Sequence, residues 1–205
     1  MSTSRTYRSE LREQQAERTR KLIADAARAR FVEKGWAGTS VRSVAEAAGV
    51  SEATVYHVYG SKAGLAGSLL DSAERGADVD RVVAELRERA GDPAGQLRAF
   101  VGFDRRLFER GGDVLRILAE GRRQHPDLGA AYAEGRSRGD RERRTVFSTW
   151  PAPVWRPGVD VERAVAVYAM TVTLDGFDTA TGEFGWRPDD VEDWWLSSLA
   201  AVLLR

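Results

Sequence analysis

The sequence of 205 residues predicts an all-α protein with an N-terminal three-helix module and a larger C-terminal helical bundle. Through most of the chain, apolar residues recur at intervals of three and four, as they do on one face of a helix. No stretch alternates apolar and polar residues in the manner of a half-buried strand. Glycines and prolines stand between the periodic segments, where helices end.

The first packed helix is predicted from about residue 19 to 34. Its buried stripe repeats every four residues, and its members are Ile23, Ala27 and Phe31. Gly35 and Trp36 then turn the chain into the next segment. Residues 1–17 precede the helix as a polar arm in which arginines and glutamates are interleaved. Such an arm is solvated, or it lengthens the helix through i,i+4 ion pairs, or it becomes ordered on DNA.

Residues 39–62 organise the whole sequence, because they form two short helices around a three-residue turn. The apolar face of the first helix is made by Val41, Val44, Ala45 and Ala48. Thr39 or Ser40 provides its N-cap. Gly49 ends it, since glycine readily takes the left-handed conformation that closes a helix. Ser51 caps the second helix, so the segment is predicted to be a helix-turn-helix.

The second of these helices is mostly small and polar apart from Val55 and its aromatic residues. One face is therefore anchored, and the other is free to enter the major groove of DNA. The residues expected to read bases are Glu52, Ala53, Thr54 and His57. Those expected to hold phosphates are Thr39, Arg42, Tyr56 and Lys62. The alternative for each is an ordinary solvent-facing role, or core packing for Tyr56, and Tyr59 is assigned to the core.

At these residues the chain resembles the TetR family of transcriptional regulators, over residues 19 to 66. The resemblance to the family's first helix is carried by Leu22, Ile23, Ala26, Ala27, Phe31 and Gly35. The resemblance after the recognition helix is carried by Tyr56, Tyr59, Ser61, Lys62 and Leu65. The sequence departs from the family pattern at three positions. Val58 stands where the family usually has a His or Tyr that touches phosphate, and Glu52 stands where a basic or small residue is commoner. Gly64 replaces a usual Glu.

The resemblance implies a homodimer that binds a palindromic operator in double-stranded DNA. It also implies a small-molecule effector that binds in the C-terminal bundle and moves the helix after Lys62. Under this interpretation residues 1–66 form the DNA-binding domain and residues 67–205 the regulatory and dimerisation domain. The charges agree, because the chain is neutral overall while residues 1–65 hold eleven basic and seven acidic side chains. Chance fluctuation remains the alternative explanation of that imbalance.

The rest of the chain is also predicted to be helical. The expected segments are 65–86 with Gly76 as a weak point, 95–109, 114–119, 126–147, 161–178 and 189–204. Gly91, Asp92 and Pro93 end the first of these segments. Residues 150–158 contain too many prolines for a helix and are expected to form a loop.

The last two helices carry the argument for a dimer. Residues 164–174 contain no charge and are apolar almost all round, so one buried face does not account for them. The final helix has a stripe made by Val191, Trp195, Leu199 and Val202. Trp194 points about 100° away from that stripe and would be exposed in a monomer. The residues assigned to the dimer interface are Trp194, Trp195, Leu199 and Val202. A monomer with one exposed tryptophan is the alternative.

Asp104 interrupts an otherwise apolar helix face, and an unpaired buried carboxylate is costly. One interpretation is an internal ion pair with an arginine. The other is an effector site selecting a ligand with a cation or hydroxyl, lined by Phe100, Phe103, Asp104, Trp155, Tyr168 and Thr171.

Several other classes of protein are disfavoured. The absence of cysteine excludes disulfides and thiolate metal sites and agrees with a reducing cytoplasm. The N-terminus lacks an apolar leader, and no stretch is long enough to span a membrane. We expect neither metal nor cofactor nor enzyme activity, because two histidines cannot supply a cluster and Gly135-Arg-Ser-Arg-Gly139 lacks a preceding strand. A DNA-binding protein without effector, constitutive or architectural, is the second candidate, and an enzyme is the third.

Overall fold

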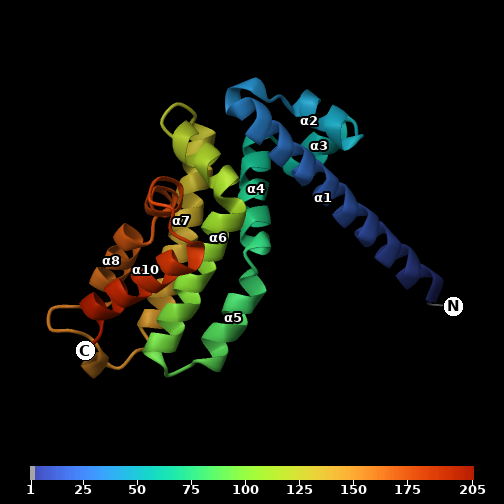
Figure 1. Cartoon of the computed structure of the whole chain (residues 1–205). Coiled ribbons are helices and arrows are strands. Elements are labelled where there is room, and N and C mark those ends of the chain that lie inside the picture. The colour runs from blue at the N-terminus through green and yellow to red at the C-terminus, as the bar shows by residue number, and fades with distance from the viewer. Residues whose placement is uncertain (1–2) are drawn as a thin grey trace. The chain divides into compact units, whose positions relative to one another are not determined.

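The computed structural model describes the backbone of residues 3–205 and the side chains of residues 12–205. The described chain is helical throughout and contains no strand, which confirms the predicted all-α class (Figure 1). Its α-helices are α1 (Thr3–Gly38), α2 (Val41–Ala48), α3 (Glu52–Tyr59), α4 (Lys62–Gly76), α5 (Val79–Glu88), α6 (Pro93–Gly121), α7 (Pro126–Phe147), α8 (Val161–Thr171), α9 (Leu174–Asp178) and α10 (Pro188–Leu203). A 3₁₀ turn (Ala152–Val154) and a π-helical turn (Thr179–Glu183) complete it. The arm's first eleven side chains lie outside the described residues.

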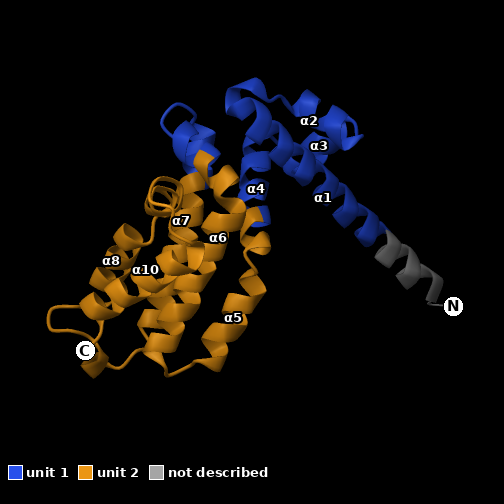
Figure 2. Ribbon diagram, viewed as in Figure 1, with its two compact units in different colours: residues 1–72, 117–131 blue, residues 73–116, 132–205 orange. Residues whose placement is uncertain are grey.

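The chain divides into two compact units (Figure 2). Unit 1 comprises Met1–Ser72 and Ile117–Ala131, and unit 2 comprises Ala73–Arg116 and Tyr132–Arg205. The boundaries therefore fall inside α4, α6 and α7. The division at residues 66 and 67 rests on family resemblance rather than on compactness, and it stays a prediction.

Unit 1 contains the helix-turn-helix that the sequence predicts. Ser40 and Ser43 form a reciprocal capping box at the start of α2, with the two N–H···O distances at 3.0 and 3.1 Å. Gly49 closes α2 at φ 68°, and the N–H of Val50 donates to the carbonyl of Ala45 at 3.0 Å. Ser51 then caps α3 by accepting from the N–H of Thr54. The predicted caps and turn are confirmed.

Helix α1 is longer than the predicted segment at both ends. Gly35 has φ 66° and ψ 178°, so it interrupts the helical backbone where the sequence places a turn. The ring of Trp36 comes back onto Phe31, and the two stack with centroids 5.0 Å apart. The buried stripe of Ile23, Ala27 and Phe31 is confirmed, because all three side chains are fully buried.

After the helix-turn-helix, several of the predicted segments differ from the structure. The segment 65–86 is not one helix, because α4 ends at Gly76 and α5 begins at Val79. Conversely, the two segments predicted at 95–109 and 114–119 are one helix, α6. Gly111 lies inside α6 and packs against α4. A Cβ atom at this position would come 2.7 Å from the Cβ of Ala73. Close helix packing, rather than a helix stop, explains this glycine.

The segment predicted as one helix over 161–178 is also divided, since α8 ends at Thr171. Thr173 then starts α9 as an N-cap, its hydroxyl accepting from the N–H of Gly176 at 3.1 Å.

Unit 2 has a core rich in aromatic side chains. Trp150 and Trp155 stack with centroids 4.9 Å apart, and Phe147 lies against both. The buried stripe of α10 repeats every four residues and consists of Val191, Trp195, Leu199 and Leu203. Val202, which the sequence analysis places in this stripe, is not one of its buried members, because its side chain is 50% exposed.

Candidate nucleic-acid interface

The outward surface of α3 is free of internal contacts at most of the predicted base-reading positions. Glu52, Ala53 and His57 are exposed, and so is Tyr56. Thr54 is half-buried, with its hydroxyl 2.8 Å from the hydroxyl of Ser51. Val55 points inward and is buried, so it anchors the helix and leaves the opposite face for a partner.

This exposed face offers chemistry suited to the edges of base pairs. Glu52 accepts hydrogen bonds, as cytosine N4 requires, and the methyl group of Ala53 can contact a thymine methyl. His57 can donate or accept according to its protonation state. Since α3 carries Glu52 as its only acidic residue and no lysine or arginine, affinity for phosphate must come from other elements.

Thr39 does not lie where a phosphate contact requires it. The residue is 2% exposed, and its hydroxyl lies 3.0 Å from the carbonyl oxygen of Arg30 and 2.9 Å from that of Gly35. The hydroxyl donates to one of these two oxygens at the end of α1. The structure therefore gives Thr39 a role in joining α1 to α2 instead of the expected contact.

Lys62 is also occupied inside unit 1. Its ammonium group donates to the carbonyl oxygen of Trp36 at 2.5 Å and lies 4.3 Å from the centroid of the indole ring. Burial lowers the pKa of Lys62. The amine thus completes the end of α1 and fixes the start of α4 against it, which differs from the expected role in binding phosphate.

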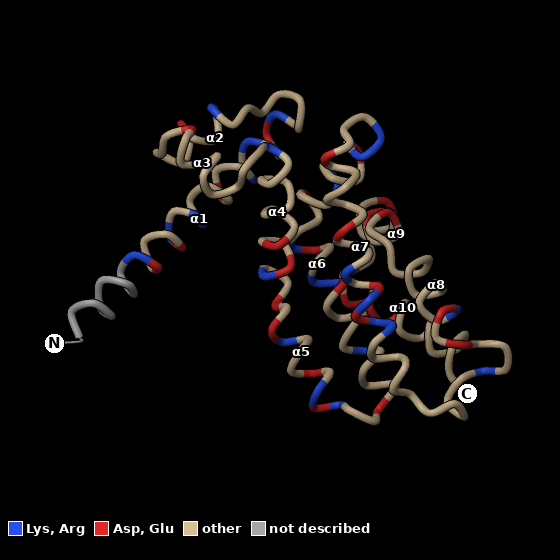
Figure 3. Tube along the Cα trace, turned by 180° about the vertical axis from the view of Figure 1, so that it is seen from behind, with Lys and Arg blue, Asp and Glu red and all other residues tan. Residues whose placement is uncertain are grey.

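Arg42 is exposed as predicted, but it has an internal partner. Its Nε donates to Oε1 of Glu46 at 3.0 Å, one helical turn along α2, and this hydrogen bond raises the pKa of Arg42. Only Arg42, Glu46 and Glu52 are charged in α2 and α3. The traces of these two helices are accordingly mostly tan in Figure 3. A phosphate that approaches Arg42 must therefore compete with Glu46.

Tyr59 connects α3 to α1, in agreement with the internal role assigned to it. Its hydroxyl donates to the carbonyl oxygen of Arg20 at 2.9 Å. Because this carbonyl belongs to α1, the hydrogen bond joins the two helices and restricts the rotation of α3 about its axis. The face that carries His57 is held outward as a result.

The pattern of caps, buried stripe and free polar face matches a known family model. Residues 23–69 match the model of bacterial regulatory proteins of the tetR family. The chain carries a helix-turn-helix segment of the TetR-family type. This agrees with the resemblance noted in the sequence and covers the described helix-turn-helix of unit 1.

Two relatives with curated descriptions are HTH-type transcriptional regulators. The chain is 32% identical over 114 residues to the HTH-type transcriptional repressor NicS of Pseudomonas putida, and 39% identical over 70 residues to the uncharacterized HTH-type transcriptional regulator YvkB of Bacillus subtilis. These matches cover 56% and 33% of this chain, but only 53% and 37% of the two relatives.

A solved TetR-family structure extends the likeness to nearly the whole chain at the level of the fold. NalD of Pseudomonas aeruginosa, described as the secondary repressor of a multidrug efflux pump, is 22% identical and superposes with a TM-score of 0.71. The superposition covers 93% of this chain and 98% of that one. At this identity the match supports the fold alone.

In unit 2 the structure brings together only part of the predicted effector site. Asp104 and Tyr168 are in contact, and Phe100 lies beside Tyr168 with ring centroids 6.4 Å apart. Trp155 stacks on Trp150 and is joined to this group through Phe147, which lies against both Trp155 and Tyr168. Phe103 and Thr171 are half-buried, and the hydroxyl of Thr171 donates to the carbonyl of Val167 within α8.

Asp104 has internal partners, which is the first of the two interpretations drawn from the sequence. Its Oδ2 accepts from the hydroxyl of Tyr168 at 2.8 Å and from Nη1 of Arg143 at 3.3 Å. The guanidinium of Arg143 also stacks over the Tyr168 ring at 4.5 Å and donates to Asp140. Among the described residues no hydrogen bond reaches Oδ1 of Asp104.

The four residues assigned to a dimer interface divide into two pairs. Trp195 and Leu199 are buried within unit 2, so they are core residues. Trp194 is 51% exposed and Val202 is 50% exposed. Only this second pair is available to another molecule.

No helix in the described part of the chain is long and apolar enough to cross a bilayer.

The hydrogen bonds that hold these elements in place have little signal in the sequence. In the sequence Tyr59 and Lys62 look like ordinary surface groups, and only the structure shows that they reach carbonyl groups of α1. One signal was present for Lys62, because the carbonyls at the end of α1 need donors and a lysine follows the helix-turn-helix.

Proposed function

We propose that this protein is a DNA-binding transcriptional repressor that works as a dimer and leaves its operator when a small molecule binds unit 2. The observation that carries the DNA-binding part is the capped helix-turn-helix, whose α3 presents Glu52, Ala53 and His57 outward while Val55 anchors it. An α-helix of this kind fits the major groove and reads base edges with such side chains.

The repressing action rests on similarity. The printed names of NicS and NalD both describe repressors. A repressor needs no contact with polymerase, only occupation of its site, so the DNA-binding unit and a second copy are sufficient for it.

The dimer is supported by exposed apolar side chains of unit 2. They are Met170, Phe184, Trp186, Trp194 and Val202. Trp186 and Trp194 contact each other edge to face with centroids 6.4 Å apart. Apolar side chains of this size are normally covered, and a second copy would bury the same helices of each chain. We assign Trp194 and Val202, both on α10, to the contact with the partner copy.

We assign the effector site to the surroundings of Asp104 in unit 2. Asp104 and its neighbours Phe100 and Tyr168 are the best candidates, because Oδ1 of Asp104 is left for a donor on a ligand. One observation favours the second candidate function, a DNA-binding protein without effector. Oδ2 of Asp104 already accepts from Tyr168 and Arg143, so no ligand is needed to stabilise the carboxylate.

The experiment that tests the proposed function is selection of DNA from a pool of random duplexes by the purified protein. The expected result is enrichment of one sequence with twofold symmetry, with half-sites about 34–36 Å apart or at a multiple of that spacing. A matched variant, His57→Ala, should alter the enriched half-site. Retention of DNA without any enriched sequence would overturn the proposal.

A further inference from the structure

The joint between α4 and α5 has an unfavourable backbone conformation. Gly76 ends α4, Val79 begins α5, and the buried Ala77 lies between them. Asp78 has φ 61° and ψ 57°, and it is the one non-glycine residue with positive φ in the described chain. A side chain disfavours this left-handed conformation, although Asp tolerates it better than most residues. Contacts from elsewhere must therefore hold the joint.

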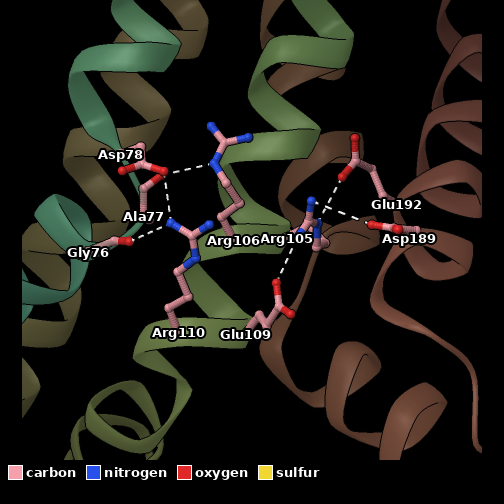
Figure 4. Close-up of polar contacts among 9 residues, drawn as sticks. All are labelled: Gly76, Ala77, Asp78, Arg105, Arg106, Glu109, Arg110, Asp189 and Glu192. Atoms are coloured by element: carbon pink, nitrogen blue, oxygen red, sulfur yellow. Dashed lines mark hydrogen bonds and ion pairs between the residues drawn. The ribbon is translucent and has the colours of Figure 1, made fainter.

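Two arginines of α6, one helical turn apart, supply these contacts (Figure 4). Nη1 of Arg110 donates to the carbonyl oxygen of Gly76 at 2.9 Å and to Oδ2 of Asp78 at 2.8 Å. Nε of Arg106 donates to the carbonyl oxygen of Ala77 at 3.0 Å. The last carbonyls of a helix lack donors of their own helix. Helix α6 thus acts as the C-cap of α4.

The guanidinium of Arg106 is buried, and its hydrogen-bonding groups are only partly satisfied. The residue is 4% exposed, and no carboxylate of the described chain lies within 4 Å of it. Its Nη2 is buried without a partner. Burial lowers the pKa of Arg106, and Arg81 repels it while Glu85 of α5 attracts it. A buried guanidinium that is only partly satisfied favours any arrangement that gives it a carboxylate.

The preceding residue connects the same turn of α6 to the other side of unit 2. Nε of Arg105 donates to Glu192 of α10 at 2.9 Å, and the guanidinium lies 3.6 Å from Asp189 (Figure 4). Consecutive residues of α6 therefore hold α10 and the joint at the end of α4. Helix α4 begins at Lys62, directly after α3, so the joint is also connected by the chain to the helix-turn-helix.

We propose that Arg106 and Arg110 form a latch on the α4–α5 joint and that opening of this latch is the regulatory step of unit 2. In the open state Arg106 leaves the carbonyl of Ala77 for a carboxylate of α5, and the end of α4 is released. The regulatory part rests on the proposed function, because it assumes that α4 transmits the change to a helix that binds DNA. The latch itself does not depend on that assumption.

Amide hydrogen exchange of the full-length protein tests the latch directly. Arg110→Gln and Arg106→Met should each speed exchange of the amides of residues 77–82 by about tenfold or more, while α10 keeps its protection. Arg98→Gln is the matched control, since Arg98 is exposed on the same helix. Exchange within twofold of the original protein in both variants would refute the latch.

A second pair of variants keeps the test decisive if the arginine variants unfold. Asp78→Gly accepts the positive φ, whereas Asp78→Val resists it. The glycine variant should keep most of the protection at residues 79–82, and the valine variant should lose it. Equal protection in the two variants would show that the conformation of this residue does not set the joint.

Binding to the selected operator tests the regulatory part. Arg110→Gln should weaken binding about fivefold or more, because a loosened α4 must be ordered again on DNA. Faster exchange with unchanged affinity would leave the latch as a purely structural device and refute its regulatory role. If the original protein selects no DNA sequence, the proposed function fails, while the exchange result still decides the latch.

Discussion

The hydroxyl of Tyr168 donates to Oδ2 of Asp104 across 2.8 Å, within the aromatic core of unit 2. Arg143 reaches the same oxygen at 3.3 Å and covers the Tyr168 ring. Burial raises the pKa of Asp104, and attraction by Arg143 and the hydrogen bond from Tyr168 offset part of that rise. Burial therefore destabilises the ionised carboxylate, while Arg143 and the hydrogen bond from Tyr168 stabilise it.

This arrangement predicts the effect of pH on Asp104→Asn. Because the pKa of Asp104 is raised by folding, the folded state binds the proton more tightly than the unfolded chain. The group therefore stabilises the fold most below its unfolded pKa of about 4, and this contribution is lost as the pH rises through the folded pKa. Asp104→Asn should gain stability relative to the original protein over that range. Thermal melting of both proteins between pH 4 and pH 8 measures the difference.

A second variant at the same position is the control. Asp104→Leu leaves Tyr168 without an acceptor and Arg143 with Asp140 alone. It should lose about 3–5 kcal/mol, the cost of breaking a buried pair on one side. A leucine variant as stable as the asparagine variant, or an asparagine variant whose relative stability falls with rising pH, would contradict this account of the cluster.

Arg42 is expected to bind DNA more tightly when Glu46 is removed. Glu46→Ala frees the guanidinium and deletes a negative charge beside the phosphates, so affinity should rise about two- to fivefold. The salt dependence of binding should also steepen, by about one unit of slope if Arg42 gains a phosphate contact. Fluorescence anisotropy at several salt concentrations gives both quantities.

The matched control is Glu162→Ala, which breaks the ion pair with Arg144 in unit 2 and removes the same charge. It should leave the affinity unchanged. If both variants bind equally well, the effect is one of net charge, and Arg42 has no special role.

Glu52 is expected to determine sequence preference. Because it is exposed at the start of α3, Glu52→Ala should change the preferred base at one position of each half-site, where a good contact discriminates by about 1–3 kcal/mol. Sequencing of DNA selected by each protein measures this. Glu52 can act by accepting a hydrogen bond from a base or by repelling phosphates. Glu52→Gln separates these two causes, because it removes the negative charge and keeps an acceptor. The same enriched sequences for the alanine variant would exclude Glu52 as a base reader.

The dimer prediction concerns Trp194 and Val202. The original protein should scatter light with twice the chain mass of 22.6 kDa, and Trp194→Asp with Val202→Asp should give the monomer mass. The fold should survive, since both side chains are about half exposed. Leu199→Asp, in contrast, should unfold unit 2, because that side chain is fully buried. A monomeric original protein, or a double variant that remains dimeric, would contradict the assignment.

Much of unit 1 could be predicted because its signals are local. Ser40, Gly49 and Ser51 act on backbone groups within a few residues, so their roles follow from chain order. The family match over residues 23–69 covers the same segment. Thr39 and Lys62 instead contact carbonyl groups near the end of α1. The spacing of apolar residues in the sequence carries no information about such contacts.

Unit 2 was harder to predict because its glycines have more than one use. Gly76 ends a helix, whereas Gly111 lets α4 approach α6 inside one. The difference depends on a neighbour more than thirty residues away. The partner of Asp104 was one of many arginines in the sequence, and only the packing of α7 against α6 identifies Arg143. The exposed α3 residues remain predictions as contacts until DNA is present.

The central claim is that α3 reads a DNA sequence, and the ratio of two affinities tests it most directly. The selected operator and a scrambled duplex of equal length should be titrated with the protein at the same physiological salt concentration. The account predicts at least about a thousandfold tighter binding to the operator. It also predicts that His57→Ala or Glu52→Ala reduces the ratio while leaving the affinity for scrambled DNA nearly unchanged. A ratio near one, with both affinities falling together as salt is added, would contradict it.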